Sequence, residues 1–183
     1  MPDDAGKSIC VYLGARPGEA PHWAEAAAHA GRTIAERGHT LVYGGGKLGL
    51  MGILADAALD AGGRVVGVIP EALVEREQIH RTLHENHVVK DMHARKSKLV
   101  DLADAFLVLP GGFGTLDELF EAITWRQLDF HAKPIALWSV QGYYDALWQF
   151  LSAGRQHGFM PDETFRSLRF DEDLTALLDQ LVA

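Results

Sequence analysis

A glycine-rich segment, PGGFGTLDE at residues 110–118, contains the residue types best suited to chemistry in this chain. It follows the apolar run DAFLVL and precedes the pattern LFEAITWRQL, so it links a predicted strand to a predicted helix. Glycine lets the backbone approach a ligand closely, and the free N–H groups at a helix N-terminus favour an anion. Thr115 can cap this helix or donate to a phosphate oxygen. The segment therefore predicts a binding site for a phosphate group.

Two glutamates follow this loop, and one of them, Glu118, is a candidate for a catalytic carboxylate. Glu118 and Glu121 are three residues apart, so a helix would place them on one face at the mouth of the loop. Asp117 lies about 100° round the helix from Glu118, and we expect it to be a solvated acid that compensates the helix dipole. A carboxylate near a sugar whose phosphate is bound can stabilise an oxocarbenium ion or activate water. We expect this chemistry of Glu118.

A second glycine-rich turn, GGGKLGLMG at residues 44–52, follows another predicted strand. Ligands bind beyond the carboxyl ends of parallel strands, so we expect Gly45 and Gly46 to approach the same ligand. The turn contains a formal G-x-G-x-x-G pattern, but it does not follow the first strand and no suitable acid ends the next one. Lys47 is followed by leucine rather than serine or threonine, so the P-loop pattern is missing too. Either turn can also be a plain strand-to-helix connection.

Positive charge gathers in DMHARKSKL, residues 91–99, where Arg95, Lys96 and Lys98 stand close together. Such a run usually forms a solvated helix face. Next to a phosphate loop and a glutamate, however, a fixed guanidinium is suited to clamp an anionic substrate. We therefore expect Arg95 to contact the ligand.

Composition and charge limit the classes of function. The net charge of −8 argues against a broad nucleic-acid-binding surface. The one cysteine, Cys10, excludes an internal disulfide and suits a reducing cytoplasm. The segment MPDDAGKSIC does not resemble a signal peptide, and no apolar run approaches the ~20 residues that cross a membrane. We expect a cytoplasmic protein that binds neither nucleic acid nor membranes.

The elements that position these residues alternate between short apolar runs and longer helical patterns. We predict strands at residues 8–13, 40–45, 64–69, 87–90, 105–110 and 134–138. We predict helices at residues 19–38, 49–62, 92–103, 115–130, 143–158 and 171–183. Continuous apolar strands indicate a parallel sheet buried on both faces. The prediction is a single Rossmann-like α/β domain over residues 1–183, with a doubly wound, mostly parallel sheet flanked by helices.

Three motifs together resemble the Lonely Guy (LOG) family. They are GGGKLGLMG, MHARK and PGGFGTLDE, in this order and spacing, and the likeness extends from CVYLGARPG to GFM. The family comprises cytokinin riboside 5'-monophosphate phosphoribohydrolases, long labelled as possible lysine decarboxylases. The resemblance implies a Rossmann-like homodimer that hydrolyses nucleoside 5'-monophosphates, such as AMP or isopentenyladenosine monophosphate, to free base and ribose 5-phosphate. It implies no metal and no redox cofactor.

The resemblance also assigns roles by position. Arg95 and Glu118 match the catalytic pair of the family. Substrate-binding positions match Glu77, Lys96, Gly111, Gly112, Phe113, Gly114, Thr115 and Thr124, and Glu121 falls at the second acidic position. One departure is GARPG at residues 14–18, where many members have serines. Arg16 there could add a phosphate contact or alter the substrate range.

Other interpretations of the sequence remain open. His80 and His84 resemble a metal-binding face if their stretch is helical, although no third ligand stands at zinc spacing. The aromatic residues around Trp125 are typical of core packing or a subunit interface, and Trp125 alone could form a wall for a base. A nucleotide carrier or sensor without turnover would need the same phosphate loops. A pyridoxal phosphate-dependent decarboxylase has little support, since no lysine lies in a recognisable Schiff-base setting.

Overall fold

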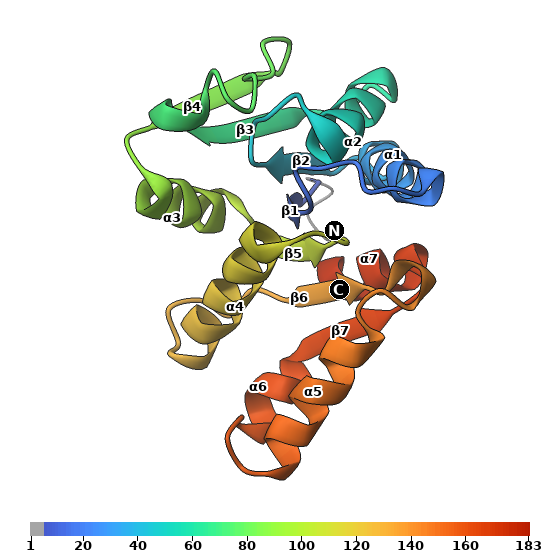
Figure 1. Cartoon of the computed structure of the whole chain (residues 1–183), viewed down its shortest axis with the longest axis vertical. Helices are drawn as coiled ribbons and strands as arrows, with labels where there is room; N and C mark the ends of the chain where they lie inside the picture. Colours follow the sequence, from blue (N-terminus) through green and yellow to red (C-terminus); the bar gives the residue numbers. More distant parts are fainter. Residues whose placement is uncertain (1–5) are drawn as a thin grey trace, which may run out of the picture.

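The computed structural model describes residues 6–183, in which seven parallel strands form one sheet in the order β4-β3-β2-β1-β5-β6-β7 (Figure 1). The strands are β1 (Ser8–Tyr12), β2 (Thr40–Tyr43), β3 (Val65–Pro70), β4 (Glu85–Val89), β5 (Ala105–Val108), β6 (Ile135–Trp138) and β7 (Leu168–Asp171). The predicted α/β class and the doubly wound, parallel sheet are confirmed.

Helices cover both faces of the sheet (Figure 1). They are α1 (Pro21–Glu36), α2 (Gly49–Asp60), α3 (Met92–Leu102), α4 (Phe113–Gln127), α5 (Asp145–Gln156), α6 (Asp162–Ser167) and α7 (Leu174–Val182). Two short 3-10 turns, Glu71–Leu73 and Val140–Gly142, complete the elements. Val11 and Leu13 of the first strand region pack with α1, α2 and α7, while Cys10 and Tyr12 pack with α3, α4 and α5. Successive residues thus serve two cores, which explains why the strand sequences are continuously apolar.

Local signals fix where several helices begin. Pro21 occupies the first position of α1, where its missing N–H costs nothing. The Asp91 carboxylate accepts a hydrogen bond from Ala94 N at 2.8 Å and caps α3. Such a cap stabilises a helix by about 1 kcal/mol. It fixes the first turn of the helix that carries Arg95.

The structure differs from the sequence prediction in two regions. Strand β7 and the short helix α6 were not predicted, because four residues, LRFD, are too few to show a strand pattern. Helix α4 begins at Phe113, two residues before the predicted start, and Gly112 is its N-cap. Thr115 is therefore not the cap, and Asp117 and Glu118 lie in the second turn rather than the first. Nowhere in residues 6–183 is there a helix long and apolar enough to cross a membrane.

The order of the strands reverses at β1. From β1 the chain adds β2, β3 and β4 on one side, and then returns to add β5, β6 and β7 on the other. The connections after β1 and β5 consequently leave the sheet at adjacent carboxyl ends and diverge. Open α/β sheets bind ligands at such a switch point.

Candidate active site

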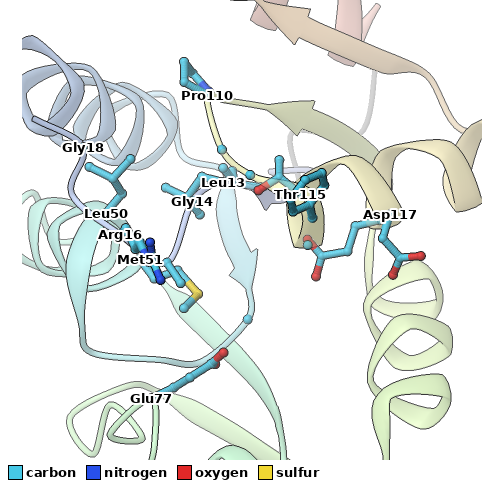
Figure 2. A pocket seen from close by; sticks show the side chains of 18 of the residues that line it. Leu13, Gly14, Arg16, Gly18, Leu50, Met51, Glu77, Pro110, Thr115 and Asp117 are labelled. Atoms are coloured by element: carbon cyan, nitrogen blue, oxygen red, sulfur yellow. The ribbon is translucent and has the colours of Figure 1, made fainter.

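A cavity of about 760 Å³ opens at this switch point (Figure 2). The connections after β1, β2 and β5 contribute Leu13 to Arg16, Gly44 and Pro110 to Thr115 to its lining. Further lining residues come from α1, α2, the 71–79 segment, α3 and α4: Trp23, Leu50, Met51, Leu73, Glu77, Met92, Arg95, Asp117 and Glu118. Its volume falls within the ~300–1,000 Å³ typical of small-molecule sites.

The loop between β5 and α4 forms one wall and is shaped for close approach by a ligand. A Cβ on Gly111 would lie 2.0 Å from Thr115 Oγ1 and 2.7 Å from Gly14 N, so only glycine fits there. Around Gly112 and Gly114, by contrast, nothing lies within 4 Å of the Cβ position. The first amides of any α-helix lack intrahelical acceptors, and those of α4 begin at Phe113. This wall offers donors suited to an anion.

Two hydrogen bonds hold the loop between β5 and α4 in place. Gly14 N, on the connection after β1, donates to the Pro110 carbonyl at 3.1 Å. The Tyr143 hydroxyl donates to the Gly111 carbonyl at 2.6 Å. These bonds join segments more than 30 residues apart in the sequence and give the loop a defined shape before a ligand binds.

Glu118 lies on α4 and faces the cavity, where it is partly buried. Burial raises the pKa of its carboxyl from 4.5 to about 7. The positive charge of Arg95 opposes this rise, and the negative charges of Asp117 and Glu77 add to it. Near neutral pH the group is therefore close to its midpoint, which suits a carboxyl that takes part in charge or proton transfer.

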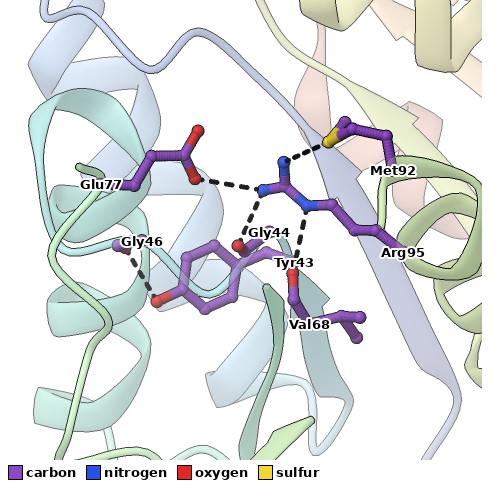
Figure 3. Close-up of polar contacts among 7 residues, drawn as sticks. All are labelled: Tyr43, Gly44, Gly46, Val68, Glu77, Met92 and Arg95. Carbon is purple, nitrogen blue, oxygen red and sulfur yellow. Dashed lines mark hydrogen bonds and ion pairs between the residues drawn. The ribbon is translucent and has the colours of Figure 1, made fainter. Parts of the chain in front are cut away.

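Arg95 lies on α3, buried, with its guanidinium held by backbone and carboxylate oxygens (Figure 3). Its Nε donates to the Val68 carbonyl at 3.1 Å, and Nη2 donates to the Gly44 carbonyl at 2.8 Å. Nη2 also lies 3.4 Å from Glu77 Oε2. Among residues 6–183, Nη1 makes one weak contact, with Met92 Sδ at 4.0 Å. The guanidinium is thus fixed, while Nη1 retains hydrogen-bonding capacity toward a ligand.

Lys96, the next residue, is also buried but serves a different purpose. Its Nζ lies 2.6 Å from Glu121 Oε2 and 3.1 Å from Asp117 Oδ2. Burial alone would lower the pKa of this ammonium, but the bonds to Glu121 and Asp117 raise it above its usual value. Asp117 is exposed, as expected of a solvated acid, with 60% of its side chain accessible, but it also pairs with Lys96, which the sequence did not predict. The three charges join α3 to α4.

Burial of Arg95 and Lys96 also rules out a wholly solvated helix face for the 91–99 run. A helix face is solvated when nothing packs against it, whereas α3 packs on the sheet beside α4 (Figure 1). Lys98 is half-buried on the same helix. The run therefore places one cation at the cavity and one between two helices.

Several predicted substrate-binding residues lie away from the cavity. Gly44 lines it, but Gly45 and Gly46 do not. The Gly45 carbonyl accepts from His80 N at 2.9 Å, and the Gly46 carbonyl accepts from the Tyr43 hydroxyl at 3.0 Å. Those two glycines help to hold the turn in place through these hydrogen bonds. Lys96 and Glu121 sit between α3 and α4, and the exposed Thr124 donates to the Phe120 carbonyl at 2.7 Å.

Sequence reasoning missed the aromatic wall of the cavity. Trp23 of α1 and Tyr143 meet edge to face with ring centroids 5.5 Å apart. Both line the cavity, whereas Trp125 packs against the core between the sheet and α4. No periodic pattern relates Trp23 to Tyr143, because they lie far apart in the sequence. The wall becomes visible only when the chain is folded.

The histidines considered as metal ligands are engaged elsewhere. Residues 77–84 form turns rather than a helix, so the spacing of four does not place His80 and His84 on one face. His80 Nε2 lies 2.8 Å from Asp56 Oδ1, and Val65 N donates to His84 Nδ1 at 3.3 Å. In the part of the chain that the structure describes, no three His, Cys, Asp or Glu residues are placed to hold a metal ion.

Comparisons with known proteins agree on both the sequence family and the fold. A family model described as possible lysine decarboxylase matches residues 51–181. A probable cytokinin riboside 5'-monophosphate phosphoribohydrolase of Oryza sativa subsp. japonica is 46% identical over 154 residues, which cover 84% of this chain. The match spans 63% of the rice protein, less than two thirds of its length.

A cytokinin riboside 5'-monophosphate phosphoribohydrolase of Arabidopsis thaliana is 47% identical over 154 residues, covering 84% of this chain and 71% of the relative. Among solved structures, the molybdenum cofactor carrier protein of Chlamydomonas reinhardtii superposes with a TM-score of 0.73. That match covers 97% of this chain and 98% of the carrier protein. At 22% identity, this likeness shows a shared fold and nothing about the ligand.

Proposed function

The chain belongs to the Lonely Guy (LOG) family, and from this premise we propose that it is a phosphoribohydrolase of purine nucleoside 5'-monophosphates. Water would cleave the N-glycosidic bond of AMP or an isoprenylated AMP, and the products would be the free base and ribose 5-phosphate. The observation that carries the proposal is the presence of Glu118, Arg95 and the N-terminus of α4 in one cavity. A site that only held phosphate would have no use for a carboxyl with a pKa of about 7.

The phosphate end of the substrate is assigned to the loop and the start of α4. A phosphate carries a charge of about −1.5 to −2 near neutral pH and has three strong acceptor oxygens. The amides from Phe113 to Thr115 and the positive end of the helix dipole match these acceptors. The open space at Gly112 and Gly114 lets the phosphate approach the backbone without meeting a side chain.

Glu118 is assigned to the ribose. As the glycosidic bond breaks, positive charge develops on the ring, and an ionised carboxylate stabilises this charge more in the transition state than in the neutral ground state. The same carboxylate can orient the attacking water. Its raised pKa means that the ionised form is energetically costly until positive charge forms beside it.

Arg95 is assigned to charge balance and orientation. Its bonds to Val68 and Gly44 hold the guanidinium without rotamer freedom, so little entropy is lost when Nη1 meets the substrate. Glu77 offsets part of its charge and so keeps Arg95 from suppressing the positive charge of the transition state. Preorganised charges of this kind are usually the largest contribution to catalysis.

The remaining family positions take indirect roles in this proposal. Lys96 and Glu121 are side chains whose mutual contact fixes the distance between α3 and α4. Gly45 and Gly46 shape the turn that presents Gly44. Thr124 does not line the cavity formed by the described residues. Direct contact between this residue and the substrate would therefore require a rearrangement or a second subunit.

We further propose a cytoplasmic homodimer that uses no metal and no redox cofactor. Support for the dimer comes from large apolar side chains left open to solvent, including Phe130, Phe150 and Phe159. Light scattering after size-exclusion chromatography should give about twice the mass of the 20.1 kDa chain. A monomeric mass at micromolar concentration would contradict the dimer.

Product analysis tests the proposed reaction. Purified protein is incubated with AMP, with isopentenyladenosine monophosphate and with adenosine, and the bases, nucleosides and sugar phosphates are separated. We expect free base from both nucleotides and very little from adenosine, which lacks the group that the loop binds. Release of adenosine and inorganic phosphate would indicate a phosphatase instead. Tight AMP binding without release of base would favour a carrier or sensor.

A further inference from the structure

The cavity presents a charge problem for a phosphate ligand. Three carboxyl groups line it, those of Glu77, Asp117 and Glu118, and the arginines that line it are Arg16 and Arg95. A phosphate dianion would add about two more negative charges. Amides and a helix dipole supply only about half a positive charge. A cation that is free to face the phosphate would offset the charge that the amides and the helix dipole leave uncompensated.

Arg95 does not meet this requirement. It already donates to two carbonyl oxygens and lies 3.4 Å from Glu77 Oε2, so much of its charge and most of its donors are used within the protein. Lys96 does not meet it either, because its ammonium bonds to two carboxylates between α3 and α4 and does not line the cavity. The cations of the 91–99 run are thus committed to the fold.

Arg16 is the cation that remains. It lies on the connection after β1, is exposed, and faces the cavity beside Met51 and Gly14 (Figure 2). Within residues 6–183, Arg16 forms no ion pair shorter than 4.0 Å and its side chain has no hydrogen-bond partner. An arginine that shares this cavity with three carboxyl groups and pairs with none of them is available for an incoming anion.

The backbone places Arg16 next to the phosphate loop. Gly14 N donates to the Pro110 carbonyl at 3.1 Å, which joins the two connections one residue before Gly111. On the other side, the Cβ position of Gly49 lies 2.0 Å from the Ala15 carbonyl oxygen and 3.2 Å from Arg16 Cα. A side chain at position 49 would collide with this connection, which shows that the start of α2 packs closely on it. The backbone of Arg16 is thereby held in place, while its guanidinium has no partner among residues 6–183.

We propose that Arg16 is the principal cationic ligand of the substrate's 5'-phosphate, and that it sets the preference for nucleotides over nucleosides. The identification of the ligand as a phosphate rests on the proposed function. On binding, the guanidinium turns toward the start of α4 and forms charge-assisted, bidentate hydrogen bonds with phosphate oxygens. Arg95 then acts on the sugar and base, and Arg16 on the phosphate.

A plain surface arginine is the alternative, and the two roles differ in what a substitution changes. Loss of a solvated side chain alters binding of all ligands by little. Loss of a side chain that binds the phosphate weakens the binding of every compound that carries the phosphate and leaves the binding of adenosine unchanged. Replacement of Arg16 by lysine should restore part of the affinity, because a lysine keeps the charge but not the bidentate geometry.

Isothermal titration tests the role of Arg16 with ribose 5-phosphate, AMP and adenosine as probes. For Arg16→Gln we expect ribose 5-phosphate and AMP to bind about 10- to 100-fold more weakly, as for loss of hydrogen bonds to a charged group. Arg16→Lys should fall between Arg16→Gln and the wild type. Arg32→Gln, which changes an exposed arginine on α1 away from the cavity, serves as the matched control and should bind all three probes normally.

Titration separates this inference from the proposed function, because it needs no turnover. If Arg16→Gln binds ribose 5-phosphate within twofold of the wild type, the inference is overturned whatever the activity. Equal weakening for adenosine and AMP would overturn it too, as would a wild type that binds neither phosphate ligand. If the wild type binds AMP through Arg16 but releases no base, the inference holds and the proposed hydrolase activity fails.

Discussion

Replacement of Glu118 by glutamine should make the protein more stable at high pH, although it should abolish most activity. Burial favours the neutral form of this carboxyl and raises its pKa from 4.5 to about 7. In the folded protein the proton is therefore held more tightly than in the unfolded chain. The associated stability is fully present below pH 4.5 and is lost as the pH rises through 7.

The magnitude follows from the two pKa values. Each pKa unit corresponds to about 1.4 kcal/mol, so the change from 4.5 to about 7 amounts to about 3 kcal/mol lost at high pH. About 2 kcal/mol of this is already lost at pH 6, and roughly 1 kcal/mol more is lost between pH 6 and pH 8.5. Glutamine stays neutral throughout, so Glu118→Gln avoids this loss. Other titrating groups are shared by both proteins and cancel in the difference.

Urea unfolding of the wild type and Glu118→Gln at several pH values from 6 to 8.5 measures this difference. The range stays above the sequence pI of about 5.5, where solubility is lowest. We expect the advantage of Glu118→Gln to grow by roughly 1 kcal/mol across this pH range. Glu25→Gln, at an exposed position of α1, is the control and should show no such trend. A difference between Glu118→Gln and the wild type that does not change with pH would refute the raised pKa of Glu118.

Further predictions concern the chemistry of the same cavity. The kcat of the wild type should rise with pH through about 7 as Glu118 ionises, and Glu118→Gln should lower kcat by about 100-fold or more, with a smaller effect on AMP binding. Lys96→Met removes a cation that lowers the pKa of Glu118, so its pH–kcat profile should move to higher pH; an unmoved profile would contradict this coupling. Gly111→Ala should destabilise the protein by about 1–3 kcal/mol because the new Cβ would collide with Thr115 and Gly14. Gly112→Ala should have the same melting temperature as the wild type, because nothing lies near its Cβ position. Activity should survive EDTA, and loss with recovery on adding zinc would point to a metal site.

The sequence predicted those parts of the site that follow from strand ends. Continuous apolar runs gave the parallel sheet, and glycine-rich segments after two strands indicated the edge where a ligand would bind. Glu118 was expected near that edge because it follows one of these segments, whereas Arg95 was paired with it through its charge and the resemblance to the LOG family. The fold therefore needed no tertiary information, whereas the common cavity of this pair is seen only in the folded chain.

Other features depend on packing that no local pattern records. The bonds of Lys96 to Asp117 and Glu121 exist because α3 lies against α4. The sequence alone therefore could not show that Asp117 pairs with a cation. The pair Trp23 and Tyr143 meets across 120 residues of chain. The two-residue error at the start of α4 moved the acids by half a turn, and with it the expected role of Thr115.

The fate of the oxygen from water tests the proposed reaction most directly. AMP is hydrolysed by the wild type in water enriched in oxygen-18, and the products are analysed by mass spectrometry after one turnover. Cleavage of the N-glycosidic bond predicts unlabelled adenine and one labelled oxygen on C1 of ribose 5-phosphate, read before the sugar exchanges with solvent. Label in inorganic phosphate, or labelled water with no adenine released from bound AMP, would contradict the proposal that this protein is a phosphoribohydrolase.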